Sequence, residues 1–440
     1  METSQKARPA GGIKESTTVK IIVIGFLVLG LLIPAAMVRS LIKEREYRRQ
    51  AVVREISSKW GASQRVTGPV LSVPYIETIP AGKGKPVEVV HHLHILPETL
   101  KISGEALPEV RYRGIYEAVL YNAQIGLTGE FKLPDLQALD IKPKSVRWQK
   151  AIISMGISDL KGVKSAVKMN LSDVDLNMNP GMETSDLFDT GVSSRLSVNP
   201  ELKNLSFSAS LNLNGSTLLS FAPVGRETTA ALSSPWPDPS FDGDFLPVNR
   251  YIKSDGFSAE WNVLHLNRSY PQIWKDKKYD LMSSSFGVSL VIPADAYQKA
   301  ERTVKYAAMF IVLTFMALFF SEVMNRIRIH PFQYLLVGLA LIIFYSLLIS
   351  IAEHLGFAKG YLIASAATIL LITGYARSVL RKKSLALMVG SLLTLLYVYL
   401  YVLLQLGDYA LLFGSIGLFV ILAAVMFLTR RINWYTPAGT

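Results

Sequence analysis

The 440-residue chain contains no cysteine. This absence excludes a disulfide framework, a cysteine-ligated zinc site and thiol chemistry. The chain also lacks the glycine-rich phosphate loop of nucleotide-binding enzymes, the HExxH pattern of zinc hydrolases and the G-x-S-x-G pattern of serine hydrolases. The sequence therefore contains no motif for a hydrolase or for a nucleotide-driven enzyme.

Charged residues are also scarce, at 18% of the chain, whereas 50% of the residues are hydrophobic and the mean hydropathy is +0.30. This composition is too apolar for an ordinary soluble enzyme. The formal net charge is +12, but the basic residues flank apolar runs and do not form one patch. We therefore expect membrane lipids as partners, and no nucleic acid.

Long apolar runs are abundant. A helix needs about 20 apolar residues to cross the hydrocarbon core of a bilayer, which is about 30 Å thick. The segments that meet this requirement are 19–38, 304–324, 332–352, 357–376, 384–404 and 409–429. The first is isolated, whereas the short connections between the others predict a five-helix transmembrane bundle over residues 304–429.

The short loops predict the orientation, because lysine and arginine are retained on the cytoplasmic side. Basic residues follow the second, fourth and sixth predicted helices: Arg326, Arg328, Arg377, Arg381, Lys382, Lys383, Arg430 and Arg431. The alternate loops hold only Glu353, Lys359 and Asp408. We expect residues 1–18 and 430–440 in the cytoplasm and the long interval after the first helix on the other side of the membrane.

The segment directly after the first predicted helix, "RSLIKEREYRRQAVVRE", disagrees with this orientation, because it is more basic than the residues before that helix. Its apolar residues recur at near-helical spacing, so residues 39–67 are predicted to form a basic helical stalk. The basic side chains either form a solvated face with neighbouring glutamates or lie on anionic lipid. A cleaved signal peptide over residues 1–38 is the alternative, but "IPAAMVRS" lacks a good small-x-small cleavage site.

From residue 68 to 300 the hydrophobic period changes to two. In "NLSFSASLNLNGS" (204–216), apolar and polar residues alternate strictly, which is typical of a strand with one wet face. The same alternation recurs in "VLYNAQIGLTGEF" and "FGVSLVIP". We predict an antiparallel, sandwich-like β domain inserted between the first and second of six transmembrane helices, which makes the chain an α+β membrane protein.

The stretch "SSPWPDPSFDGDFLP" (233–247) combines carboxylates and aromatics with prolines. Proline fixes the backbone and aspartate caps turns, so a rigid structural or interaction loop is predicted. A calcium loop would need further oxygen ligands at regular spacing, and a catalytic pair would need two carboxylates around a cleft. The candidate contact residues are Trp236, Asp238, Phe241, Asp242, Asp244 and Phe245.

Two further groups of residues are candidate sites. His92 and His94 share a strand face and would chelate zinc if a third ligand joined them, but the spacing does not identify His265 as that ligand. The alternative is a pair of half-exposed strand histidines, and we predict no metal and no cofactor. In the bundle, Glu322, Glu353, His354 and Asp408 lie at predicted helix ends. Ionisable groups at the centre of a membrane mark ion paths, whereas groups at helix ends are solvated cheaply.

Several long segments resemble the CreD family of inner-membrane proteins from gram-negative bacteria. They are "GPVLSVP", "SPWPDPSFDGDFLP", "TFMALFFSE", "HPFQYLLVGLALIIFYSLLISIAEHLGF" and "TRRINWY". The order of one helix, a basic segment, a β-rich region and five helices is also similar to that family.

The resemblance implies an inner-membrane protein with a periplasmic β domain, controlled by a two-component sensor and regulator pair. It implies a role in envelope integrity, tolerance to colicins and the response to β-lactams, and it implies no catalytic residue or cofactor. We therefore expect a non-enzymatic protein with an unidentified periplasmic or inner-membrane protein partner. The alternative is a transporter or lipid-handling protein that uses the five-helix bundle. Oligomeric state is not predicted.

Overall fold

The computed structural model describes residues 17–80, 86–276, 279–290, 292, 296–325, 327–406 and 409–430. The chain forms two compact units. The helical unit comprises Met1–Arg48 and Ala294–Thr440, and the β unit comprises Arg49–Pro293.

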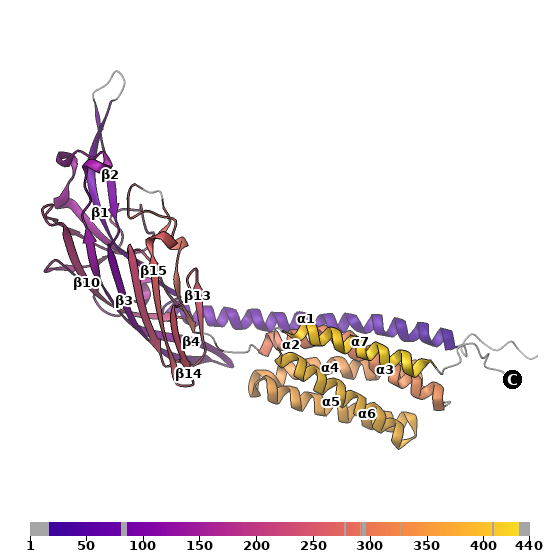
Figure 1. The fold of residues 1–440 in the computed structure, drawn as a ribbon. Helices are drawn as coiled ribbons and strands as arrows, with labels where there is room; N and C mark the ends of the chain where they lie inside the picture. The colour runs from indigo at the N-terminus through magenta and orange to yellow at the C-terminus, as the bar shows by residue number, and fades with distance from the viewer. Residues whose placement is uncertain are drawn as a thin grey trace, which may run out of the picture. The chain divides into compact units, whose positions relative to one another are not determined.

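The helices of the chain are α1 (Thr17–Trp60), α2 (Ala296–Lys305), α3 (Ala307–Asn325), α4 (Pro331–Leu355), α5 (Phe357–Leu380), α6 (Lys383–Gln405) and α7 (Ala410–Thr429) (Figure 1). By length and composition, α1, α3, α4, α5 and α6 are long and apolar enough to cross a membrane, and α7 contains a shorter apolar stretch, Leu412–Ala423. The described residues therefore contain five to six apolar helices, as expected for a membrane protein.

The predicted β region, residues 68–300, was too long at its C-terminal end, because helix α2 begins at Ala296. The buried residues of α2 are Tyr297, Ala300, Thr303 and Val304, and the remaining positions carry most of its charges. This helix is amphipathic, but its ten residues are too few to show a clear helical period between the last predicted strand and the long apolar run. The second predicted span, from residue 304, begins in the structure at Ala307, the first residue of α3.

The predicted boundary at residue 39 does not interrupt α1, which continues to Trp60 and includes Pro34. The helix ends before Gly61, whose φ of +154° and close approach to the carbonyl of Asn214 leave no room for a side chain. Strand β1 begins at Gln64. The last residues of the predicted stalk, 64–67, are therefore strand and not helix.

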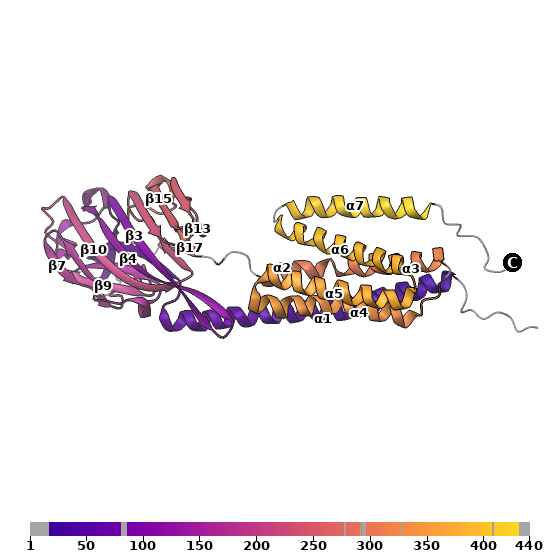
Figure 2. The same cartoon turned by 90° about the horizontal axis from the view of Figure 1, so that it is seen from below.

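In the residues that the structure describes, the β unit contains two sheets, of nine and eight strands (Figure 2). The nine-stranded sheet has the order β13-β17-β11-β1-β5-β9-β8, with β2 paired to β1 and β16 paired to β2. The eight-stranded sheet has the order β14-β15-β12-β3-β4-β10-β6-β7. The strands are β1 (Gln64–Ile79), β2 (Val87–Ile95), β3 (Thr99–Arg113), β4 (Tyr116–Lys132), β5 (Ala151–Ile157), β6 (Lys168–Leu171), β7 (Val174–Asn177), β8 (Asn179–Pro180), β9 (Gly191–Leu196), β10 (Asn204–Ser216), β11 (Leu218–Phe221), β12 (Glu227–Ser234), β13 (Pro239–Gly243), β14 (Asn249–Lys253), β15 (Gly256–Leu264), β16 (Ile273–Lys275) and β17 (Phe286–Leu290).

The sheets are mixed and not purely antiparallel as predicted. β1 pairs with β11 in parallel, and β3 pairs with β12 in parallel. The alternation of apolar and polar residues reports only which face of a strand is buried, so it cannot distinguish the two strand directions.

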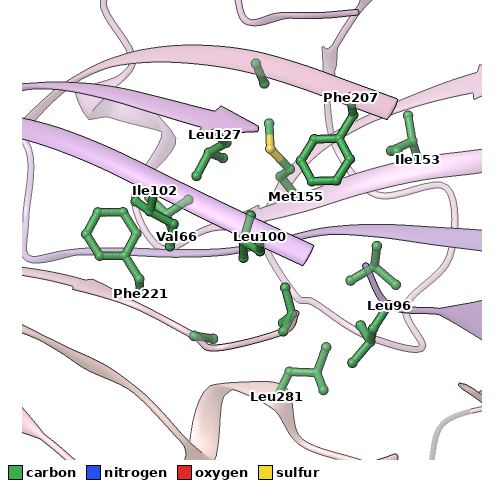
Figure 3. Packing of buried hydrophobic residues seen from close by; sticks show 14 of the residues in the cluster. Val66, Leu96, Leu100, Ile102, Leu127, Ile153, Met155, Phe207, Phe221 and Leu281 are labelled. Atoms are coloured by element: carbon green, nitrogen blue, oxygen red, sulfur yellow. The ribbon is translucent and has the colours of Figure 1, made fainter. Parts of the chain in front are cut away.

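Both sheets contribute to one hydrophobic core (Figure 3). Val66, Met155 and Phe221 come from the nine-stranded sheet, and Leu127 and Phe207 come from the eight-stranded sheet. Burial of each large apolar side chain stabilises the unit by roughly 1.5–3 kcal/mol. Along β10 the apolar positions are buried and nearly every alternate position is exposed or half-buried, which confirms the alternation predicted for this segment. The polar face of the eight-stranded sheet is thereby left open to solvent.

Candidate functional site

The outer face of the eight-stranded sheet carries a groove of about 840 Å³. It crosses β3, β4, β10, β12 and β15. The lining residues at outward-facing strand positions, together with Ser165 from a loop, are Ser103, Glu105, Gln124, Gly126, Ser210, Asn212, Ala231, Ser233, Ser258 and Glu260. Most of these side chains are small and polar.

Strand register explains why the groove lies here. Ala231 pairs with Ser103, Ser103 pairs with Gly126, and Gly126 pairs with Ser210. Four neighbouring strands therefore place in one row a methyl group, two hydroxymethyl groups and a glycine that has no side chain. Since adjacent strands lie about 4.8 Å apart, this row gives the groove a floor about 14 Å long.

The chemistry of the lining limits what the groove binds. Hydroxyl and amide groups supply both donors and acceptors, and the only charged side chains among the described lining residues are the carboxylates of Glu105 and Glu260. Asn249 Nδ2 donates to Glu260 Oε2 at 3.0 Å. An anionic ligand would be repelled by these carboxylates, and the outward-facing positions of the lining hold no large apolar side chain for an apolar ligand. The groove suits a neutral or cationic chain that is rich in hydroxyl and amide groups.

The groove offers several serines but little means of activating them. A serine nucleophile needs a general base within hydrogen-bond reach, most often histidine or lysine. Among the described residues that line the groove there is neither. The arrangement therefore favours binding over covalent chemistry.

The aromatics of the stretch 233–247 pack inward. Phe241 and Asp242 lie in strand β13, which pairs with β17, so only the residues around this strand form the predicted loop. Trp236, Phe241 and Phe245 are partly buried against the core of the β unit. The ring of Phe241 meets those of Phe257 and Trp261 edge to face, with centroids 5.8 Å apart in each case. Such pairs add about 0.5–1.5 kcal/mol to the burial of the rings. The aromatics of this loop therefore stabilise the fold of the β unit.

Two of the three carboxylates in this loop bind the protein's own chain. Asp242 accepts hydrogen bonds from the backbone N–H of Gly243 at 2.8 Å and from Ser289 Oγ at 3.4 Å. Asp244 accepts one from the backbone N–H of Ser285 at 3.1 Å. The side chain of Asp238 is exposed, and its carbonyl accepts from Trp236 Nε1 at 3.1 Å. A contact role for the six residues of this loop stays a prediction.

The histidines of β2 meet an aspartate that the sequence did not indicate. His92 Nδ1 lies 2.8 Å from Asp186 Oδ2, and His94 Nε2 lies 3.6 Å from the same oxygen. His94 is fully buried, and its Nδ1 lies 2.8 Å from Ser72 Oγ. Burial lowers the pKa of His94 to about 4, and the charge of Asp186 opposes this effect only in part.

His265, the other candidate ligand, lies in the short 3-10 helix η6 (His265–Asn267). In the parts of the chain that the structure describes, no group of three histidine, aspartate or glutamate side chains is placed to hold a metal ion. His92 and His94 both turn toward one oxygen of Asp186 instead. The contact joins two imidazole rings to one carboxylate oxygen, with His92 and Asp186 half-buried and His94 fully buried.

Glu322 joins three helices at one end of the bundle. Its carboxylate is buried and accepts hydrogen bonds from the ammonium group of Lys20 in α1, from Tyr334 Oη in α4 at 3.1 Å, and from the backbone N–H of Ile329 at 3.1 Å. Lys20 Nζ also donates to the carbonyl of Ile329 at 2.8 Å. The carboxylate therefore holds α1, α3 and α4 together.

Glu353 lies near the C-terminal end of α4 and also connects neighbouring helices. Tyr297 Oη of α2 donates to its Oε1 at 2.9 Å, and Arg45 Nη1 of α1 lies 4.0 Å from its Oε2. His354 is exposed on the helix surface, and Asp408 lies outside the described residues. Both glutamates connect neighbouring helices where α4 begins or ends.

The chain has a clear similarity to one family. The family model described as "Inner membrane protein CreD" matches residues 16–435. The chain is 34% identical over 415 residues to the Inner membrane protein CreD of Escherichia coli (strain K12), which covers 93% of this chain and 91% of that protein. Among solved structures, native yeast LTA4 hydrolase covers 52% of this chain and 35% of its own, at 6% identity and a TM-score of 0.20, which is too low to support an inference.

Proposed function

We propose that this chain, which belongs to the CreD family of inner membrane proteins, is a non-enzymatic protein that binds a polar chain of the cell envelope in the groove of its eight-stranded sheet. The ligand class is a neutral or cationic polymer with many hydroxyl and amide groups, such as the glycan strand of peptidoglycan, whose N-acetylated sugars are neutral. The observation that carries this proposal is the row of small residues that crosses the sheet.

The proposal places the β unit in the periplasm and both termini in the cytoplasm. The support is the distribution of basic residues, because the connection between α5 and α6 carries Arg381 and Lys382, and Arg328 lies between α3 and α4. Lysine and arginine in short loops are retained on the cytoplasmic side. The lack of cysteine is compatible with an oxidising compartment.

A protein that is anchored in the inner membrane and binds the cell-wall polymer would couple the membrane to the cell wall mechanically. This role accords with the support of envelope integrity, tolerance to colicins and response to β-lactams that the family resemblance implies. The transport alternative requires Glu322, Glu353 or His354 to face a water-filled path. The contacts of Glu322 and Glu353 with neighbouring helices favour the binding role over transport.

Filling the groove tests the proposal. Ala231→Tyr and Ser210→Tyr place a bulky ring on the groove floor, and tyrosine suits an exposed strand position. Ser206→Tyr is the matched control, because Ser206 is exposed on the same face of β10 and does not line the groove. The full-length proteins are purified in a neutral detergent and sedimented with isolated peptidoglycan.

We expect the two groove variants to remain in the supernatant and the wild type and Ser206→Tyr to sediment. Cells that carry a groove variant should also lose the envelope-stress tolerance that the wild type confers. If all variants sediment alike, the groove is not the binding site.

A further inference from the structure

A second surface, on the helical unit, collects positive charge. It consists of Arg39 and Lys43 of α1, which lie one turn apart, and of Lys305 of α2 together with Arg302, which lies three residues before Lys305 and therefore shares its side of that helix. We call these four residues the basic cluster. Glu301 is the carboxylate in contact with it, and Arg39 donates to Glu301 Oε1 from Nε at 3.0 Å and from Nη2 at 2.7 Å. Four cations and one carboxylate leave the cluster with a net charge of about +3, before the neighbouring Glu46 one turn further along α1 is counted.

The two lysines lie close to the same carboxylate. The pKa of Glu301 lies below its ordinary value, chiefly because Arg39 hydrogen-bonds the carboxylate, and the charges of Lys305 and Lys43 act in the same direction. Within the described parts of the chain, Lys43, Arg302 and Lys305 have no ion pair or hydrogen bond from their side chains, and all three side chains are exposed. Their donors are available to an anion.

An apolar track leads along α1 to this cluster. Leu29, Ile33, Ala36, Ser40 and Lys43 follow one another at intervals of three or four residues and therefore share one helix face. The apolar part of this row is Leu29, Ile33 and Ala36, and the small polar residue Ser40 lies between it and Lys43. Leu29 is 63% exposed and Ile33 is 66% exposed, and only 11% of the most apolar window of α1 is buried. This face is available to lipid.

The length of the track fits one leaflet of a bilayer. The rise along the helix from Ile33 to Lys43 is about 15 Å. The hydrocarbon core of a bilayer is about 30 Å thick, so one leaflet contributes about 15 Å. A lipid whose chain lies on this face of α1 would therefore bring its headgroup to the basic cluster.

We propose that the basic cluster binds the phosphate of an anionic phospholipid headgroup, with the acyl chain lying along the exposed apolar face of α1. The cations provide the attraction for the phosphate, and the apolar track makes a phospholipid the ligand in preference to free phosphate. Each lysine or arginine near anionic lipid contributes about 1 kcal/mol to the binding free energy, which corresponds to about a fivefold change in affinity.

The test uses the full-length protein in a neutral detergent. The apparent affinity for phosphatidylglycerol is obtained from the rise in melting temperature as the lipid is added in mixed micelles, and phosphatidylethanolamine serves as the zwitterionic comparison. The variant Lys43→Gln/Arg302→Gln/Lys305→Gln removes the three free cations and keeps the Arg39–Glu301 pair. The matched control, Lys101→Gln/Lys132→Gln/Lys142→Gln, removes the same charge from exposed positions of the β unit.

We expect the wild type and the control to prefer phosphatidylglycerol, and the cluster variant to bind it on the order of 100-fold more weakly. If the triple variant gives no cooperative melt, the three single variants replace it, each with an expected loss of about fivefold. The proposal is overturned if the cluster variants bind phosphatidylglycerol as the wild type does, or if the wild type binds both lipids alike. It is also overturned if inorganic phosphate alone raises the melting temperature as much as the lipid does and the cluster variants lose this rise. The site would then bind free anions and not a phospholipid.

Discussion

Lowering the pH from 7 to 5 is expected to destabilise the β unit through His94. The imidazole is fully buried, and burial lowers its pKa to about 4, whereas histidine in an unfolded chain titrates near 6.5. Between these two values the unfolded chain binds more protons than the folded one. The stability that neutral His94 contributes is therefore present above pH 6.5 and is lost as the pH falls toward 4.

The size of the effect follows from the two pKa values. The full difference corresponds to about 3 kcal/mol, of which about 2 kcal/mol is lost between pH 7 and pH 5. Burial would raise the pKa of Asp276, but hydrogen bonds from His91 and His92 outweigh it and hold that pKa below its usual value, so Asp276 titrates at lower pH.

The measurement is denaturant unfolding of the full-length protein in a neutral detergent at pH 7 and pH 5, followed by tryptophan fluorescence. Trp274 reports on this site, because its ring centroid lies 5.5 Å from that of His94. His94→Gln removes the titrating group, and His265→Gln is the control outside the cluster. We expect a loss of about 2 kcal/mol in the wild type and in the control, and a much smaller loss in His94→Gln. An equal loss in all three proteins would show that His94 is not the group responsible for the pH dependence.

Two further predictions concern the polar contacts and the loop. Glu322→Gln leaves the ammonium group of Lys20 without its carboxylate partner, and we expect the free energy of unfolding of the helical unit to fall by about 3–5 kcal/mol, measured as a lower melting temperature in detergent; a melting temperature equal to that of the wild type would contradict this. Phe241→Ala removes a ring that packs on Trp261 and should cost about 2–3 kcal/mol, whereas Asp238→Ala should change stability by less than about 0.5 kcal/mol. Equal losses in these two variants would show that the inward packing of the aromatic ring is not what stabilises the loop.

The parts of the fold that sequence predicts are those set by local geometry. Side chains alternate across a strand, so the apolar positions of β10 were predicted to be buried before any partner strand was known. The same holds for α4, whose apolar run is long enough to cross a membrane and begins after His330 as N-cap and Pro331 as the first helical residue.

The parts that sequence does not predict depend on pairs of residues far apart in the chain. The groove floor requires the register of four strands, and a shift of one residue in any of them would turn Ser103 or Ser210 toward the core. The partner of His92 is Asp186, which lies in a loop without a periodic pattern. The serines of β10 were recognised as a wet face, but only the neighbouring strands reveal that this face is hollow.

We propose that the groove lies outside the cytoplasm and is occupied by an envelope polymer in living cells. Because the chain has no cysteine, Ser210→Cys and Ser206→Cys each introduce the only reactive thiol. The measurement is the rate at which a membrane-impermeant maleimide labels each variant, in intact cells and in purified protein. We predict that both variants are labelled in intact cells. We also predict that the labelling rate of Ser210→Cys, divided by that of Ser206→Cys, is lower in cells than in purified protein. Labelling of both variants only after the cells are opened would place the groove in the cytoplasm, and the same relative rate in both conditions would show that the groove is empty in cells.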